Sequence, residues 1–132
     1  MVFLSKRKNI FVIMFSLLIF LGFNTSIAKA ATLVDDSGFN LQTGMTSATT
    51  SRVTLKSGQS LKIEVYMYAN SPKKALKYKI FRNGVELFSG SINGTTQRYI
   101  EKSFSPSSAE YSLRVYSADK KQSAYGGIQV YK

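Results

Sequence analysis

The chain of 132 residues contains no cysteine, no histidine and no tryptophan, and it has only two prolines. Without cysteine it can form no disulfide, thiolate nucleophile or lipid-anchored cysteine. Without histidine it can hold no Ser-His-Asp triad, and zinc sites made of His and Cys are excluded as well. It carries neither a glycine-rich phosphate loop nor a dinucleotide-binding fingerprint. We therefore predict no catalytic residue, no metal site and no cofactor, and a protein that is not an enzyme.

Carboxylates are scarce, with seven Asp and Glu against eighteen Lys and Arg. Glu64 and Glu101 both fall in the middle of expected strands, so one interpretation is a hydrolase with a carboxylate pair across a cleft. We favour the other interpretation, in which each glutamate balances a lysine on the same sheet face. A Ser–Lys dyad is a further alternative, although no residue pair stands out for it. Asp35 and Asp36 are the only calcium candidates, and an acidic turn before the first strand explains them equally well.

The only long hydrophobic run lies at the beginning of the chain. Three basic residues at 6–8 precede an apolar run at 10–23, and a polar stretch then ends in Ala-Lys-Ala at 28–30. This order is typical of a secretory signal peptide cleaved after Ala30. The alternative, a membrane anchor, requires about 20 apolar residues, and this run is shorter. We predict that residues 1–30 are removed and that the bacterial protein is secreted, extracellular or cell-wall associated.

The remaining residues have the periodicity of strands. Residues 31–51 are a polar N-terminal segment with a short first strand at 32–34 or 39–41 and a polar loop at 46–51. Residues 52–132 alternate between apolar and polar side chains, which is typical of strands with one buried face. The expected strands cover residues 53–55, 61–67, 76–82, 85–92, 96–104, 111–115 and 128–130.

Two Asn-Gly pairs mark turns in the middle of the chain. Asn83-Gly84 lies between two alternating runs and predicts a hairpin, because both residues tolerate positive φ. Asn93-Gly94 predicts a second hairpin, which would make residues 76–104 a three-stranded meander. With about seven or eight short strands, we predict an all-β fold, a single small antiparallel β-sandwich of jelly-roll or Greek-key type in residues 52–132.

The net charge of the chain is +11, and four basic residues but no acidic ones fall within residues 1–30, which leaves +7 for residues 31–132. Such a charge attracts polyanions. The alternative is that the charge only keeps a small domain soluble.

The alternation also predicts which side chains face water, and many of them are aromatic or cationic. Rings can pack on sugars, and Lys or Arg can hold phosphate or carboxylate groups. The alternative is that strand propensity alone places these residue types on an outer face. Glu86 and Phe88 are expected to face outward as well. We predict that the candidate binding residues share one basic and aromatic sheet face. They are Lys62, Tyr66, Tyr68, Lys77, Lys79, Phe81, Arg114, Tyr116 and Tyr131.

These features favour a small secreted, non-catalytic binding module. Its expected partner is an anionic cell-envelope or extracellular polymer, a polysaccharide or a lipid surface, and nucleic acid is not expected as the main partner. The alternative is a secreted antibacterial or membrane-active, toxin-like protein. A further alternative uses an exposed strand edge to add a partner strand.

Overall fold

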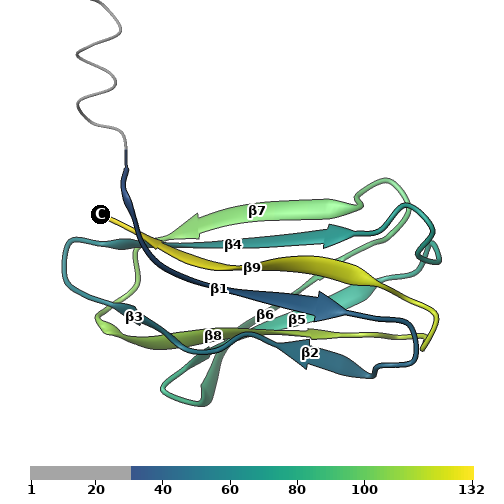
Figure 1. Cartoon of the computed structure of the whole chain (residues 1–132), viewed down its shortest axis with the longest axis horizontal. Helices are drawn as coiled ribbons and strands as arrows, with labels where there is room; N and C mark the ends of the chain where they lie inside the picture. Colours follow the sequence, from purple (N-terminus) through teal and green to yellow (C-terminus); the bar gives the residue numbers. More distant parts are fainter. Residues whose placement is uncertain (1–30) are drawn as a thin grey trace, which may run out of the picture. The chain divides into compact units, whose positions relative to one another are not determined.

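The computed structural model describes residues 31–132, so the predicted signal peptide lies outside the described residues. The described chain consists of strands joined by turns and loops (Figure 1). No helix that is long and apolar enough to cross a bilayer occurs between residues 31 and 132. The strands are β1 (Leu33–Leu41), β2 (Ser47–Thr49), β3 (Val53–Leu55), β4 (Ser60–Met67), β5 (Leu76–Arg82), β6 (Val85–Ile92), β7 (Tyr99–Phe104), β8 (Ala109–Tyr116) and β9 (Ala124–Tyr131).

The strands form two antiparallel sheets that pack face to face. Sheet A has the order β1-β9-β4-β7, and sheet B has the order β2-β8-β5-β6, with β3 also paired to β8. In Figure 1 the strands of sheet A lie above those of sheet B. The predicted all-β sandwich is therefore confirmed.

The pairing follows one long hairpin that is folded over on itself. At its tip β5 pairs with β6 through Asn83-Gly84, both with positive φ, and moving outward β4 pairs with β7, β3 and β2 pair with β8, and β1 pairs with β9. This nesting is the arrangement of a jelly roll, which has eight strand positions. The described residues form nine strands because residues 50–52 divide the second position into β2 and β3.

Two expectations about local structure were wrong. The segment predicted as a polar loop at 46–51 contains β2, which pairs with β8. The strand after Asn93-Gly94 pairs with β4 and not with β6, so residues 76–104 are not a meander. The Asn93 side chain explains this, because its Oδ1 accepts hydrogen bonds from the amides of Thr95 and Gln97, both at 2.9 Å. Such an Asx-type loop carries the chain from sheet B to sheet A.

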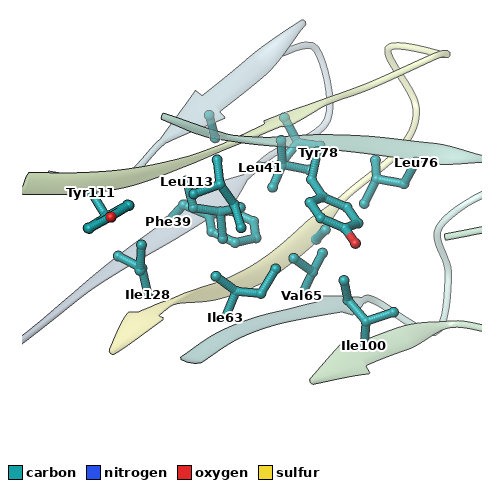
Figure 2. Close-up of a cluster of buried hydrophobic side chains, with 14 of the residues drawn as sticks. Phe39, Leu41, Ile63, Val65, Leu76, Tyr78, Ile100, Tyr111, Leu113 and Ile128 are labelled. Carbon is teal, nitrogen blue, oxygen red and sulfur yellow. The ribbon is translucent and has the colours of Figure 1, made fainter. Parts of the chain in front are cut away.

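Alternating side chains of both sheets fill the space between them (Figure 2). In β4 every second residue from Leu61 to Met67 is buried, as the sequence pattern predicts. Figure 2 shows Ile63 and Val65 of sheet A facing Leu113 and Tyr78 of sheet B. Fully burying a Leu, Ile or Val side chain contributes about 1.5–3 kcal/mol, so this layer supplies most of the stability of a domain without disulfides.

Gln122 is a fully buried polar side chain that ties together two loops at one end of the sandwich. Its Nε2 donates to the carbonyls of Lys74 and Ala75 at 3.0 and 3.2 Å. Its Oε1 accepts from the amides of Ala118 and Asp119 at 2.6 and 3.2 Å. These bonds satisfy the amide fully and hold the loop before β5 against the loop after β8.

Candidate functional site

The nine residues predicted to bind a ligand do not lie on one surface. The outer face of sheet A carries Lys62, Tyr66, Tyr68 and Tyr131, and the outer face of sheet B carries Lys77, Lys79, Phe81, Arg114 and Tyr116. Because the sheets pack face to face, these two groups point in opposite directions. The expectation of a single basic and aromatic wall was therefore wrong. Alternation along a strand separates inside from outside, but it does not tell to which sheet the strand belongs.

Phe88 was also expected on the outer face, and the structure places it on the interior side. A bulge between Ile80 and Phe81 shifts the register, so that Phe88 lies opposite Ile80. Its ring centroid is 5.9 Å from that of Phe104, and the Nζ of Lys102 lies 5.6 Å from the Phe88 ring. Phe81 keeps its outward position and is half-buried.

The outer face of sheet B holds a group of cations around one ring, and we call Lys77, Lys79, Arg114 and Tyr116 the basic face. Lys79 lies directly opposite Arg114, and Lys77 directly opposite Tyr116, on the paired strands β5 and β8. The Lys79 Nζ and the Arg114 Cζ lie 5.6 and 5.5 Å from the centre of the Tyr116 ring. Tyr116 thus contacts both cations that face each other.

Small hydroxyl side chains border the basic face on both sides. On β2, Ser47 lies opposite Tyr116 and Thr49 opposite Arg114, while on β6 Ser91 lies opposite Lys77 and Ser89 opposite Lys79. Within residues 31–132 the only ion pair of these cations is that of Lys79 with Glu86, at 3.4 Å. The two other charges remain open to an external anion.

More lysines lie in the two loops at the end where β5 begins and β8 ends. Lys73 and Lys74 precede β5, and Lys120 and Lys121 follow β8. Asp119 lies among them, 3.1 Å from the Lys74 Nζ. The backbone amide of Lys121 and then the Lys74 ammonium lower the pKa of Asp119 from its ordinary value. Seven of the fourteen Lys and Arg in residues 31–132 therefore belong to the basic face or to these two loops, and Glu86 and Asp119 form ion pairs with two of them.

The outer face of sheet A is aromatic instead of basic. Tyr99, Tyr66 and Tyr125 stand side by side on β7, β4 and β9, and Tyr68 follows directly after β4. The ring centroids are 5.8 Å apart for Tyr66–Tyr99, 5.3 Å for Tyr66–Tyr125 and 4.8 Å for Tyr68–Tyr125. We call these four residues the tyrosine row. Tyr99 and Tyr125 were not among the predicted binding residues. Tyr125 lay outside the strand expected at 128–130.

Next to the tyrosine row, Glu64 and Glu101 lie directly opposite each other on β4 and β7. The Lys62 Nζ lies between them, 2.9 Å from Glu64 and 3.8 Å from Glu101, as the lysine-balancing interpretation predicts. The hydrogen bond to Glu64 is the largest cause of the raised pKa of Lys62. The Tyr66 hydroxyl donates to Glu101, and this bond raises the pKa of Tyr66 well above its ordinary value.

Glu101 and Glu64 lie in one row across sheet A with Gly127 of β9 and Gly38 of β1. The two glycines have no side chains. A cavity of about 250 Å³ opens above them. Tyr66 and Tyr125 line it on one side, and Asp36 and Gln129 line it on the other. The sheet surface is therefore hollowed at the foot of the tyrosine row.

The acidic pair that the sequence suggested for calcium has another role. Asp35 lies inside β1, and its carboxylate accepts the amides of Asp36 and Thr54 at 2.9 and 3.1 Å. No group of three or more metal-binding side chains occurs in the described part of the chain.

No protein-family model and no curated protein matches the chain. Among solved structures, the chain resembles the pre-peptidase C-terminal domain of collagenase from Bacillus anthracis, with a TM-score of 0.53, 18% identity, and coverage of 74% of this chain and 89% of that one. A ZmpB structure from Clostridium perfringens, with an M60 catalytic domain and two CBM51 domains, gives a TM-score of 0.47 and 20% identity, covering 70% of this chain and 10% of that one. A second ZmpB structure, of CBM51-2 in complex with GlcNAc, gives 0.42 and 12%, covering 76% and 29%. The first likeness shows a shared β-sandwich fold, and the other two are too distant to bear on function.

Proposed function

We propose that this protein is an exported, non-catalytic binding module that holds an anionic envelope or extracellular polymer on the basic face of sheet B. The observation that carries the proposal is the direct opposition of Lys79 and Arg114 on neighbouring strands. Like charges at directly opposite positions destabilise a sheet. Glu86 pairs with Lys79, but no carboxylate in residues 31–132 pairs with Arg114 or Lys77. An anionic group that lies over this face would neutralise the positive charge that remains, so the arrangement suits a bound polyanion.

The distribution of charge supports the same ligand class. The basic face and the loops at 73–74 and 119–121 contain seven cations, of which two are paired with Glu86 and Asp119, whereas Lys62 on sheet A is outnumbered by Asp36, Glu64 and Glu101. A polymer with repeated phosphate or carboxylate groups can contact several of these lysines at once. The hydroxyls that border the basic face can donate hydrogen bonds to the same oxygens. The extracellular location rests on the signal peptide predicted for residues 1–30.

The test is sedimentation of residues 31–132 with purified bacterial cell walls, before and after chemical removal of their phosphate-containing polymers. We expect retention on intact walls that weakens as salt rises, because mobile ions screen charges on an exposed face. The double variant K77A/R114A should lose most of the retention. Lys56, an exposed lysine in the turn before β4, provides the matched control, and K56A should behave like the unmodified protein. Retention that is independent of salt and equal in both variants would contradict the proposal.

A second candidate, an anionic lipid surface, is favoured by apolar side chains at the rim of the same sheet. Val85 and Leu87 of β6 are 70% and 51% exposed and follow the Asn83-Gly84 turn. A basic surface with apolar residues at its rim suits a membrane interface. This candidate predicts that the protein binds anionic but not zwitterionic vesicles. It would be supported if V85S/L87S loses this vesicle binding while the same variant keeps its retention on cell walls.

A further inference from the structure

We propose a second, separate binding site on the opposite face: the cavity above Gly38 and Gly127 accommodates one pyranose ring of an uncharged or amine-bearing saccharide. This site goes beyond the proposed function, since it shares no residue with the basic face.

The first argument is the glycine floor. At Gly127 a side chain is excluded by the backbone, because an added Cβ would lie 2.5 Å from the carbonyl oxygen of Ser37. Gly38 has no such constraint. It lacks a positive φ, and an added Cβ would meet only the carbonyl oxygen of Gly126, at 3.4 Å.

A glycine inside a strand weakens the strand, and it often marks a place where a ligand approaches the backbone closely. Neither the conformation of β1 nor its packing requires glycine at position 38. The open floor is better explained by a ligand that occupies the space above it.

The second argument is the chemistry of the walls. On one side Tyr66 and Tyr125 offer aromatic carbon to the C–H groups of a sugar. On the other side the carboxylate of Asp36 can accept hydrogen bonds from sugar hydroxyl groups. The Oε1 of Gln129 accepts a hydrogen bond from the Tyr131 hydroxyl at 2.9 Å, which leaves the Gln129 amide nitrogen to donate to the sugar. An apolar wall facing a few polar groups is the usual composition of a small-molecule site.

The volume of the cavity and the charge of its lining limit which saccharides can bind. The cavity of about 250 Å³ is smaller than pockets for drug-sized ligands, which begin at about 300 Å³, and it therefore fits a single ring. Asp36 and Glu64 both line it, with Lys62 held by Glu64. A sugar acid would be repelled here, whereas a neutral sugar would be accepted and an amino sugar attracted.

Two variants test the site, one by filling the cavity and one by removing part of its wall. G38V fills the floor from a strand position whose backbone tolerates a side chain, and Y125A removes part of the aromatic wall. K56A is the control, because it changes an exposed side chain in the turn before β4, outside both proposed sites. Thermal unfolding of each variant establishes that it is folded before binding is measured.

The probes are the hexasaccharides of N-acetylglucosamine, glucosamine, β-1,3-glucose and galacturonic acid, titrated into residues 31–132 and followed by calorimetry. We expect at least one of the first three to bind with a Kd of about 1 mM or lower, and G38V and Y125A to weaken it about tenfold or more. K56A should leave the Kd unchanged. The proposal would be overturned if none of these three saccharides binds or if the protein prefers the galacturonate. It would also be overturned if G38V and Y125A bind the saccharide as tightly as the unmodified protein. Because G38V should keep its salt-dependent retention on cell walls, failure of this site is distinguishable from failure of the proposed function.

Discussion

Lys79 of β5 and Arg114 of β8 are directly opposite each other, and the ring of Tyr116 lies 5.6 Å from the first cation and 5.5 Å from the second. The Tyr116 ring stabilises both cations modestly, because the face of an aromatic ring attracts a positive charge. Glu86 balances the Lys79 charge at 3.4 Å, whereas no carboxylate in residues 31–132 forms an ion pair with Arg114.

Replacing Arg114 by threonine should separate stability from binding. We expect the free energy of unfolding of R114T to be unchanged or higher by up to about 1 kcal/mol, because the like-charge pair disappears and threonine suits a strand. Retention on anionic walls should fall at the same time. Urea unfolding and wall sedimentation measure the two quantities. A loss of stability larger than the expected gain would mean that Arg114 has a structural role.

Tyr66 should make the free energy of unfolding depend on pH in the alkaline range. Its hydrogen bond to Glu101 raises its pKa in the folded state, so the stabilisation is complete below the pKa of the unfolded chain, about 10, and is lost as pH rises further. The free energy of unfolding should therefore decline more steeply above pH about 10 in the unmodified protein than in Y66F. Denaturant unfolding at several pH values measures the slopes. E101Q, which removes the charged acceptor, should resemble Y66F, and identical slopes in all three proteins would exclude this explanation.

Gly94 and Gly58 form a matched pair for the cost of a side chain in a turn. Their φ angles are 80° and 81°, but an added Cβ at Gly94 would lie 2.0 Å from the carbonyl oxygen of Lys74, whereas Gly58 has no atom within 4 Å. We expect G58A to cost about 1–2 kcal/mol for the left-handed conformation alone. G94A should cost more, with about 4 kcal/mol in total, because the loop before β5 must move. Equal values would show that this loop adapts freely.

Gln122 should be among the most sensitive polar positions. Replacement by leucine leaves two carbonyls and two amides without the partner that the side chain supplies. Each buried group that loses its partner costs about 1–3 kcal/mol, so we expect Q122L to lose about 3 kcal/mol or more. Thermal unfolding measures the loss. Q97L, at an exposed position, is the control and should change stability only slightly.

The fold was largely predictable from local pattern. The alternation in residues 61–67 gave β4 and its buried side, and Asn83-Gly84 gave the hairpin at the tip of the jelly roll. The pairing of β7 was not predictable from Asn93-Gly94, because the same dipeptide serves a hairpin or an Asx-type loop. Hydrogen bonds that the Asn93 side chain accepts from the backbone amides of residues 95 and 97 decide between them, and the dipeptide alone does not reveal these bonds.

The candidate sites were less predictable than the fold. Alternation identified Tyr66 and Lys79 as outward-facing, but they belong to different sheets and never meet. The cavity depends on Gly38 and Gly127 lying side by side, although they are far apart in the sequence. Only the register between β1 and β9 brings them together, and no local signal in the sequence encodes that register.

The position of β9 has a consequence for how the chain acquires its structure. This strand lies between β1 and β4, so sheet A has no centre until residues 124–131 are available. A growing chain that lacks β9 can form the β5–β6 hairpin, but it cannot complete sheet A. The native state therefore forms only once β9 is present, and the distant pairings place refolding in the slow range of about milliseconds to seconds.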